Sequence, residues 1–340
     1  MRYLIKAVLL EDLDQLFELS SHLNSVNLPA DREAIRSIIE HSTDSFSGAI
    51  KDPTRRCYVF ALHDRDTDKV VATSMIFGQL GRRDAPYIYY RVRKEERYSK
   101  TLDRHFVHDV LQIGYSYDGP TELGGLVTHP DCRRSDAKLG LMISYVRFLF
   151  IAMHRDLFQD EILAELLPPL QPDGTSLLWQ ALGHHFTGMT YREADVLSRR
   201  NKEFIRGLFP DGDIYASLLP ADAQSVIGKV GKNTRGVEKM LRRIGFRYAN
   251  RIDPFDGGPH FIAKTGEISL IGAASPAKSA LGPPQGAQRF LLASMSDKAP
   301  WFQCVAAFGD ISPDGAIIIS REVFDALDRN PGENLWYLPI

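Results

Sequence analysis

Apolar and polar positions follow two periods along this chain, one typical of strands and one typical of helices. Runs of apolar or alternating residues predict strands at 3–9, 57–63, 70–79, 87–92, 123–128, 161–165, 246–252 and 260–263. Apolar residues spaced by three and four predict helices at 13–19, 31–40, 138–151, 175–182, 202–208, 220–228 and 234–244. A mixture of this kind predicts an α/β fold, with helices packed on a mixed sheet.

The last quarter of the chain has a different pattern. Residues 272–286 are dense in Gly, Ala, Ser and Pro, which predicts a loop. Short alternating runs at 290–294, 303–308, 316–320 and 334–339, with a helix at 321–327, predict a small β-barrel module. We therefore expect a core at 1–200, an extension at 201–270 that completes the sheet and substrate cleft, a linker at 271–287 and the barrel-like module at 288–340.

Composition narrows the class of protein. With 340 residues and 44% hydrophobic content, the chain can bury a large core. Its net charge of −2 creates no general attraction to nucleic acid or to an anionic membrane, and no run of about 18 apolar residues is present. Cys57, Cys132 and Cys304 are far apart, which favours neither a disulfide framework nor a zinc site. We expect a cytoplasmic protein with no nucleic-acid, membrane or metal partner.

A basic loop precedes the long helix at 138–151. Arg133 and Arg134 lie in this loop, and the first N–H groups of a helix lack partners within the helix. Such a helix start attracts anions, and the pyrophosphate of coenzyme A is a suitable one. A solvated turn would explain the two arginines equally well.

Matches dispersed along the chain show a family resemblance. They include Tyr90-Arg91-Val92, the segments 147–152 and 226–230, Gly245-Phe246-Arg247-Tyr248, and Phe255-Asp256-Gly257-Gly258-Pro259. Over most of residues 1–265 the chain resembles the arginine N-succinyltransferase family, which belongs to the GNAT-type acyl-CoA N-acyltransferases. The resemblance implies a GNAT-like core and transfer of a succinyl group from succinyl-CoA to the α-amino group of L-arginine, in arginine catabolism. It also implies an oligomer, without a permanently bound cofactor.

The resemblance also implies site residues. Leu126 occupies the position where the family binds acyl-CoA, and Gly140 is the only glycine that remains from the family's glycine-rich loop. Arg91 and Arg147 occupy matching positions, and a guanidinium is suited to bind the distal carboxylate of the succinyl group. Asp256 belongs to the most distinctive matching segment and is a further substrate-binding candidate. Each arginine could equally belong to a structural ion pair.

One departure from the family pattern concerns the proton acceptor. The family has a histidine after the 226–230 segment, and this chain has Gly231 there. His184, His185 or Glu165 would then have to accept the proton from the amine. Leu167 also replaces a family arginine, so ornithine or another acyl-CoA is a plausible substrate. A second hypothesis is a catalytically degenerate subunit that pairs with an active relative.

Overall fold

The computed structural model describes residues 1–21, 28–83, 85–133, 135–198, 201–286 and 288–340. It contains two compact units, each assembled from segments that are separate in sequence. The first unit consists of Met1–Gln79, Thr121–Asp160 and Thr265–Ile340, and the second of Leu80–Pro120 and Glu161–Lys264. Within the described ranges, no helix combines the length and the apolar character that crossing a membrane requires.

The first unit is built on an open sheet with the strand order β14-β15-β11-β16-β12-β13-β1-β2-β3-β6. Neighbouring strands are antiparallel except β11 and β15, which are parallel, so the sheet is mixed. The strand bounds are β1 (Tyr3–Ala7), β2 (Cys57–Asp64), β3 (Lys69–Phe77), β6 (Thr121–Thr128), β11 (Ser275–Leu281), β12 (Arg289–Met295), β13 (Phe302–Phe308), β14 (Asp310–Ile311), β15 (Ile317–Ile319) and β16 (Asn334–Pro339).

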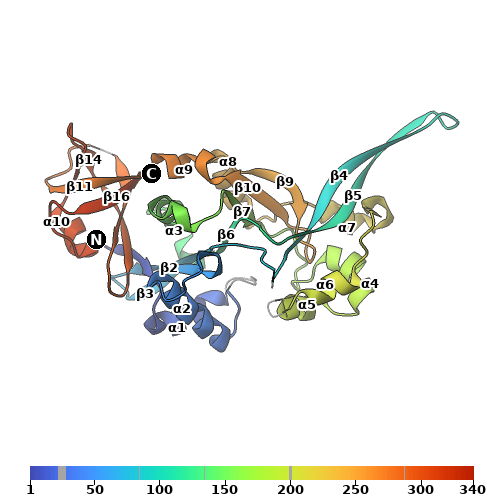
Figure 1. Ribbon diagram of the computed structural model, residues 1–340, viewed down its shortest axis with the longest axis horizontal. Coiled ribbons are helices and arrows are strands. Elements are labelled where there is room, and N and C mark those ends of the chain that lie inside the picture. The colour runs from blue at the N-terminus through green and yellow to red at the C-terminus, as the bar shows by residue number, and fades with distance from the viewer. Residues whose placement is uncertain (22–27, 84, 134, 199–200, 287) are drawn as a thin grey trace. The chain divides into compact units, whose positions relative to one another are not determined.

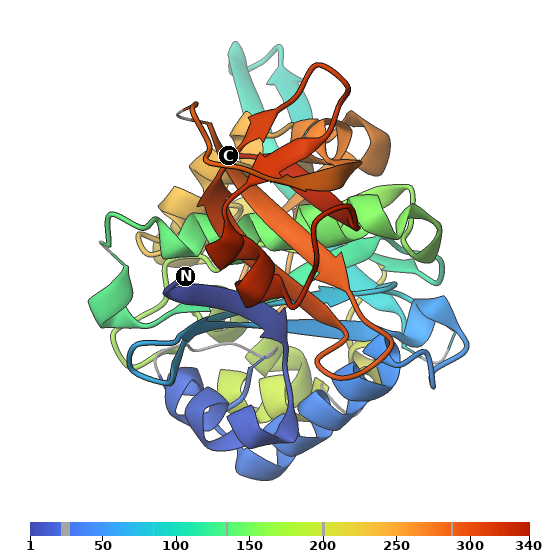
Figure 2. The ribbon, with the colours of Figure 1, turned by 90° about the vertical axis from the view of Figure 1, so that its left-hand side faces the viewer.

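Helices cover both faces of the β1–β3 strands in this unit. Figure 2 shows α1 (Leu13–Ser20) and α2 (Arg32–Phe46) on one face and α3 (Leu139–Met153) on the other. Asp31 begins α2 by accepting hydrogen bonds from the N–H groups of Glu33 and Ala34, at 3.0 and 3.1 Å. Fully buried Ile35 and Ile39 then pack toward the strands, as the predicted apolar stripe requires. The unit is completed by α9 (Ser269–Ala273) and α10 (Arg321–Leu327).

The C-terminal segment forms the predicted strands and helix, but the expected β-barrel does not close. Strand β14 ends the sheet on one side, while β13 pairs with β1, so the segment extends the sheet of the first unit. The prediction of a loop at 272–286 is wrong for 275–281, where β11 lies and pairs with both β15 and β16. Small residues suit this strand, since Ala277 and Ser279 are buried. The division into four segments stays a prediction.

The second unit has an antiparallel sheet with the order β7-β10-β9-β4-β5-β8. A stack of Trp179 on Phe255, with ring centroids 5.1 Å apart, forms part of the core under its helices. The bounds are β4 (Tyr87–Ser99), β5 (Arg104–Ser116), β7 (Glu161–Glu165), β8 (Ile214–Tyr215), β9 (Arg247–Ile252), β10 (Pro259–Lys264), α4 (His184–Thr187), α5 (Tyr191–Ser198), α6 (Glu203–Leu208), α7 (Ala221–Val226) and α8 (Arg235–Arg243).

Two features of this unit differ from the sequence prediction. β4 is longer than predicted and β5 was not predicted, and together they form a hairpin whose far end extends beyond the helices of its unit (Figure 1). The helix predicted to end at Gly183 instead continues through a π-helical turn, Trp179–Gly183, into α4. A Cβ on Gly183 would lie 2.3 Å from the ring of Trp179, so this glycine serves packing rather than helix termination.

Candidate active site

The predicted acyl-CoA position lies at a β-bulge in the first unit. Between β3 and β6 the register shifts, so Gly125 and Leu126 together lie opposite the single residue Ser74. Gly125 has a φ of +55°, and a Cβ there would lie 2.6 Å from Cγ of Met75. Only glycine fits this backbone without strain, and a bulge removes a residue from the regular hydrogen-bond ladder. The bulge leaves Leu126 partly exposed beside backbone that has departed from the strand pairing.

The start of α3 belongs to the same unit. The helix begins at Leu139 after Lys138, which has a φ of +54°, and Gly140 lies in the first turn. No acidic side chain lies in that turn, so nothing there opposes an anion. Arg133 is exposed and its Nε donates to the carbonyl oxygen of Thr128 at 3.1 Å. Arg134 lies outside the described residues.

Arg147 is a buried cation in the middle of α3. Only 2% of it is exposed, and its guanidinium donates to the carbonyl and hydroxyl oxygens of Ser144, at 3.1 and 2.8 Å. No carboxylate of the described residues forms an ion pair with it, and burial lowers the pKa of the guanidinium to about 9. Arg91, the other predicted carboxylate ligand, is exposed on β4 and belongs to the second unit.

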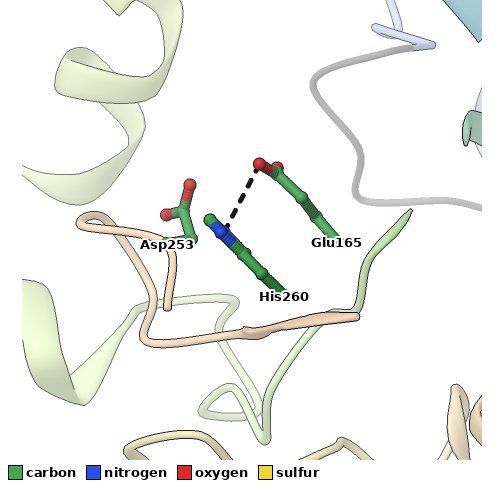
Figure 3. Close-up of side chains that lie close together, drawn as sticks. All are labelled: Glu165, Asp253 and His260. Atoms are coloured by element: carbon green, nitrogen blue, oxygen red, sulfur yellow. Dashed lines mark ion pairs between the residues drawn. The ribbon is translucent and has the colours of Figure 1, made fainter. Parts of the chain in front are cut away.

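A group of three proton-binding side chains lies in the second unit, at the ends of neighbouring strands (Figure 3). Glu165 is the last residue of β7, His260 lies directly opposite it on β10, and Asp253 follows β9. One carboxylate oxygen or imidazole nitrogen from each lies within 4.8 Å of the other two. Opposed residues of an antiparallel pair project to the same face, which brings Glu165 and His260 together.

His260 is enclosed, whereas Glu165 reaches the surface. The histidine has 0% exposure and the Glu165 side chain 35%, with Nε2 3.4 Å from Oε1. Nδ1 lies 2.5 Å from the hydroxyl oxygen of Tyr87, while Nε2 has no hydrogen-bond partner within the described chain. Burial, together with the positive charges of Arg251 and Lys202, lowers the pKa of His260 to about 3. The imidazole is therefore neutral at physiological pH.

The turn after β9 holds Asp253 in place. Its Oδ1 accepts hydrogen bonds from the N–H groups of Phe255 and Asp256, at 2.7 and 3.1 Å. The carboxylate of Asp256 accepts from the N–H of Gly258 at 2.7 Å and is buried, so its pKa is raised by burial and by the neighbouring Asp253 charge. Gly257 completes the turn with a φ of +81°. Asp256, predicted to bind substrate, thus has a structural contact in this turn.

Gly231 lies directly against the backbone. Its N–H donates to the carbonyl oxygen of Leu167 at 2.8 Å. A Cβ at this position would lie 2.7 Å from the carbonyl oxygen of Pro168 and 3.0 Å from that of Leu167. A histidine therefore requires a shift of the backbone at this position.

The structure separates the predicted histidines from the group that it assembles. His184 and His185 are exposed on α4, and Nδ1 of His184 lies 3.0 Å from the carbonyl oxygen of Met189. His260 was missed by the sequence reasoning, because only the pairing of β7 with β10 places it opposite Glu165. Its position directly after the distinctive 255–259 segment was the one available signal.

A pocket of about 430 Å³ also lies in the second unit and contains none of the predicted site residues. Its charged lining combines exposed Lys229, Arg235 and Arg242 with Glu238, and Arg242 already pairs with Glu238 at 2.9 Å. The full lining is Pro169, Ser225, Gly228, Lys229, Val230, Arg235, Glu238, Arg242, Tyr248 and Phe261.

Comparison with known proteins identifies the family. Residues 3–270 match the family described as arginine N-succinyltransferase beta subunit. The chain belongs to this family. The arginine N-succinyltransferase of Escherichia coli is 30% identical over 334 residues, which cover 97% of this chain and 96% of that protein. The arginine N-succinyltransferase subunit beta of Pseudomonas aeruginosa is 34% identical over 284 residues, 83% of this chain and 82% of the relative.

A solved member confirms the mixed α/β fold. The arginine/ornithine succinyltransferase subunit AI of Pseudomonas aeruginosa superimposes with a TM-score of 0.84 at 26% identity. The alignment covers 99% of this chain and 98% of that subunit. The likeness therefore includes the C-terminal strands as well as the segment that matches the family.

Proposed function

We propose that the protein transfers the succinyl group of succinyl-CoA to the α-amino group of L-arginine, a reaction of arginine breakdown. Family membership over residues 3–270 is the observation that carries this proposal. The Escherichia coli relative, named for the same reaction, aligns with 97% of the chain and over 96% of its own length.

The first unit offers groups suited to the acyl-CoA. The bulge at Gly125 and Leu126 frees backbone N–H groups from strand pairing, and such groups polarise a thioester carbonyl when they point at its oxygen. The start of α3, with Arg133 and Gly140, suits the pyrophosphate. Succinyl-CoA would act as a co-substrate that leaves as coenzyme A.

Arg147 is the residue we assign to the distal succinyl carboxylate. Burial of a guanidinium without a carboxylate partner is costly, and a bound carboxylate would remove much of that cost. Two parallel N–H···O bonds also give a guanidinium specificity for a carboxylate. The exposed Arg91 remains a candidate for the carboxylate of the amino-acid substrate.

The test is release of coenzyme A by the purified protein. Succinyl-CoA and L-arginine are mixed with the protein and a thiol reagent, and the product is identified by mass spectrometry. Parallel reactions replace L-arginine with ornithine and succinyl-CoA with acetyl-CoA, because the solved relative is named for both amines. Release with succinyl-CoA and L-arginine above all other pairs supports the proposal, and no release with any pair contradicts it.

One observation favours a second candidate, a degenerate subunit that pairs with an active relative. Gly231 replaces the histidine implied by the family resemblance, and its Cα packs against two carbonyl groups that leave no room for a side chain. This candidate predicts no release by the isolated chain.

We also propose that the protein is a cytoplasmic oligomer. The end of the β4–β5 hairpin exposes Tyr98, Leu102, Phe106 and Val107, at 49–67% of their surfaces. An exposed apolar group of this kind favours association with another subunit. Light scattering of the purified protein should give at least twice the mass of one chain, and a monomer mass would contradict the proposal.

A further inference from the structure

We propose that Glu165 takes the proton from the reacting amine and that His260, enclosed behind it, is the positioning residue for its carboxylate. The inference rests on the proposed function and adds to it the proton acceptor. The juxtaposition that carries it is the pairing of β7 with β10, which places the two side chains opposite one another beside Asp253.

Exposure assigns the two roles. A general base must reach the proton that it removes, either directly or through one water molecule. Glu165, with 35% of its side chain exposed, satisfies this condition, and His260 at 0% does not. His260 therefore acts through Glu165.

The contact with Tyr87 determines the tautomer of the His260 imidazole. Its phenol is buried, and burial raises its pKa, so the hydroxyl keeps its hydrogen. Its oxygen lies 2.5 Å from Nδ1 of His260, and we assign the hydroxyl as the donor of this hydrogen bond. Nδ1 is then the acceptor and Nε2 carries the ring hydrogen. Nε2 has no hydrogen-bond partner among the described residues, and Oε1 of Glu165 lies 3.4 Å from it. Catalytic hydrogen bonds are often this long before substrate binds.

The charges around the pair suit a cation such as an ammonium group. The carboxylates of Glu165 and Asp253 attract a cation, whereas Arg251 and Lys202 act on His260 with positive charge. The attraction of the two carboxylates and the repulsion from Arg251 and Lys202 are both twice as large for a divalent ion as for an ammonium group, so charge alone does not select between the two. Two carboxylates and one imidazole are a donor set that metals accept, so metal dependence is one outcome of the test.

The proton and bond changes balance as follows. Glu165 accepts one proton from the ammonium, and the amine lone pair forms a C–N bond with the thioester carbonyl carbon. Collapse of the tetrahedral adduct breaks the C–S bond and releases the coenzyme A thiolate. The nitrogen loses its second proton to solvent, and the proton held by Glu165 passes to the thiolate. Glu165 returns to its starting state, and one net proton is released.

The experiment measures kcat against pH with both substrates saturating, and succinyl-CoA binding by calorimetry. Glu165→Gln should lower kcat by about 100-fold or more, with succinyl-CoA affinity unchanged. His260→Ala should lower kcat by about 10-fold and move the acid limb of the profile up by about one pH unit, because the carboxylate loses a hydrogen-bond donor. His260→Gln keeps an N–H group on the side chain, so its kcat and the position of its acid limb should lie between those of His260→Ala and the wild type.

Controls separate this role from a structural one. Tyr87→Phe removes only the hydroxyl that contacts His260 and should also move the acid limb to higher pH. This variant tests the role of His260 even if circular dichroism shows that His260→Ala does not fold. His105→Gln and Glu203→Gln change exposed residues of the same unit and should match the wild type.

Three outcomes would overturn the inference. The first is a wild-type profile in Glu165→Gln and in a folded His260 or Tyr87 variant. The second is loss of the acid limb in His184→Gln or His185→Gln while the Glu165, His260 and Tyr87 variants keep the wild-type profile. The third is activity that a chelator abolishes and zinc restores. Absence of coenzyme A release by the wild type would instead contradict the proposed function, and the inference would fail with it.

Discussion

Gly231 shows how a single residue constrains the chemistry available to this chain. Its Cα faces the carbonyl oxygens of Leu167 and Pro168, and its N–H donates to the first of them. The hydroxyl of Thr234 donates to the same Leu167 oxygen at 3.0 Å, which fixes the loop further. The contacts that exclude a side chain therefore also hold the loop together, so a substitution here changes more than one position.

We predict that Gly231→His destabilises the second unit and does not increase activity. The new Cβ would overlap two backbone oxygens, and overpacking of this kind costs about 1–3 kcal/mol. Thermal unfolding should show a lower Tm, and coenzyme A release should not exceed that of the wild type. Gly236→Ala is the matched control, because no atom lies within 4 Å of its added Cβ. A gain of turnover at an unchanged Tm would contradict the prediction.

Arg147 gives a second prediction at this scale. Arg147→Met keeps an unbranched but shorter side chain and removes a buried charge that no carboxylate of the described residues neutralises. We expect the free energy of unfolding without ligand to stay equal or to rise. We also expect KM for succinyl-CoA to rise about 10-fold or more, because a charged hydrogen bond contributes about 1.5–3 kcal/mol.

The measurement compares two acyl donors. KM for acetyl-CoA, which lacks the distal carboxylate, should be the same in Arg147→Met and in the wild type. Equal increases in KM for succinyl-CoA and acetyl-CoA would show that Arg147 supports the structure of the site and does not recognise the carboxylate.

At the scale of elements, burial decides which parts of the fold could be read from the sequence. β2 and β3 were predicted within two residues at each end because nearly all of their side chains are buried. The outer ends of β4 and β5 are exposed, which explains why they were missed. The inner half of β5 was missed although Leu111, Ile113 and Tyr115 alternate with Gln112 and Gly114 there. β11 was missed for another reason: its Ser, Ala, Lys and Pro residues have the composition of a loop, and only its neighbours make it a strand.

The candidate site was also only partly predictable from the sequence. Glu165 was predicted from its place at the end of a strand, and the structure confirms that place. His260 could not be connected with it, because 94 residues of intervening chain do not reveal which strands pair. Local motifs thus indicated single residues, whereas the partner of each residue depended on the sheet.

The turn between β9 and β10 gives a prediction about pH. Burial and the Asp253 charge raise the pKa of Asp256, so the folded state binds this proton more tightly than the unfolded state. The contribution to stability is present at low pH and is lost as the pH rises from about 4 through the raised pKa. Asp256→Asn keeps an oxygen acceptor for the N–H of Gly258 but carries no charge.

We therefore expect Asp256→Asn to be more stable than the wild type at pH 8, by about 1 kcal/mol or more, and nearly equal at pH 4. Urea unfolding at the two pH values measures the difference. Asp211→Asn, at an exposed position of the same unit, should show no such change. Lower stability of Asp256→Asn at pH 8 would mean that the charged carboxylate is needed for the turn.

At the scale of the whole molecule, sequence order and structural units do not coincide. The first unit takes its strands from both ends of the chain, and β1 lies between β2 and the C-terminal β13. Helix α3 packs against β12 and β16 as well as β3 and β6. The C-terminal strands are therefore part of the core of this unit.

This arrangement predicts that residues 288–340 cannot be removed without loss of the first unit. Truncation after 287 would take away β12, β13 and β16, leave one edge of β1 unpaired and expose the α3 side chains that these strands cover. Because Ile5 and Phe150 are buried beside the lost strands, we expect the fragment to aggregate or to bind a hydrophobic dye, with a Tm well below that of the full chain. Gly272→Ala is the control in the same unit, because no contact lies within 4 Å of its added Cβ, and it should leave the Tm within a few degrees. Cooperative unfolding of the fragment at the Tm of the full chain would show that the C-terminal segment is an independent module.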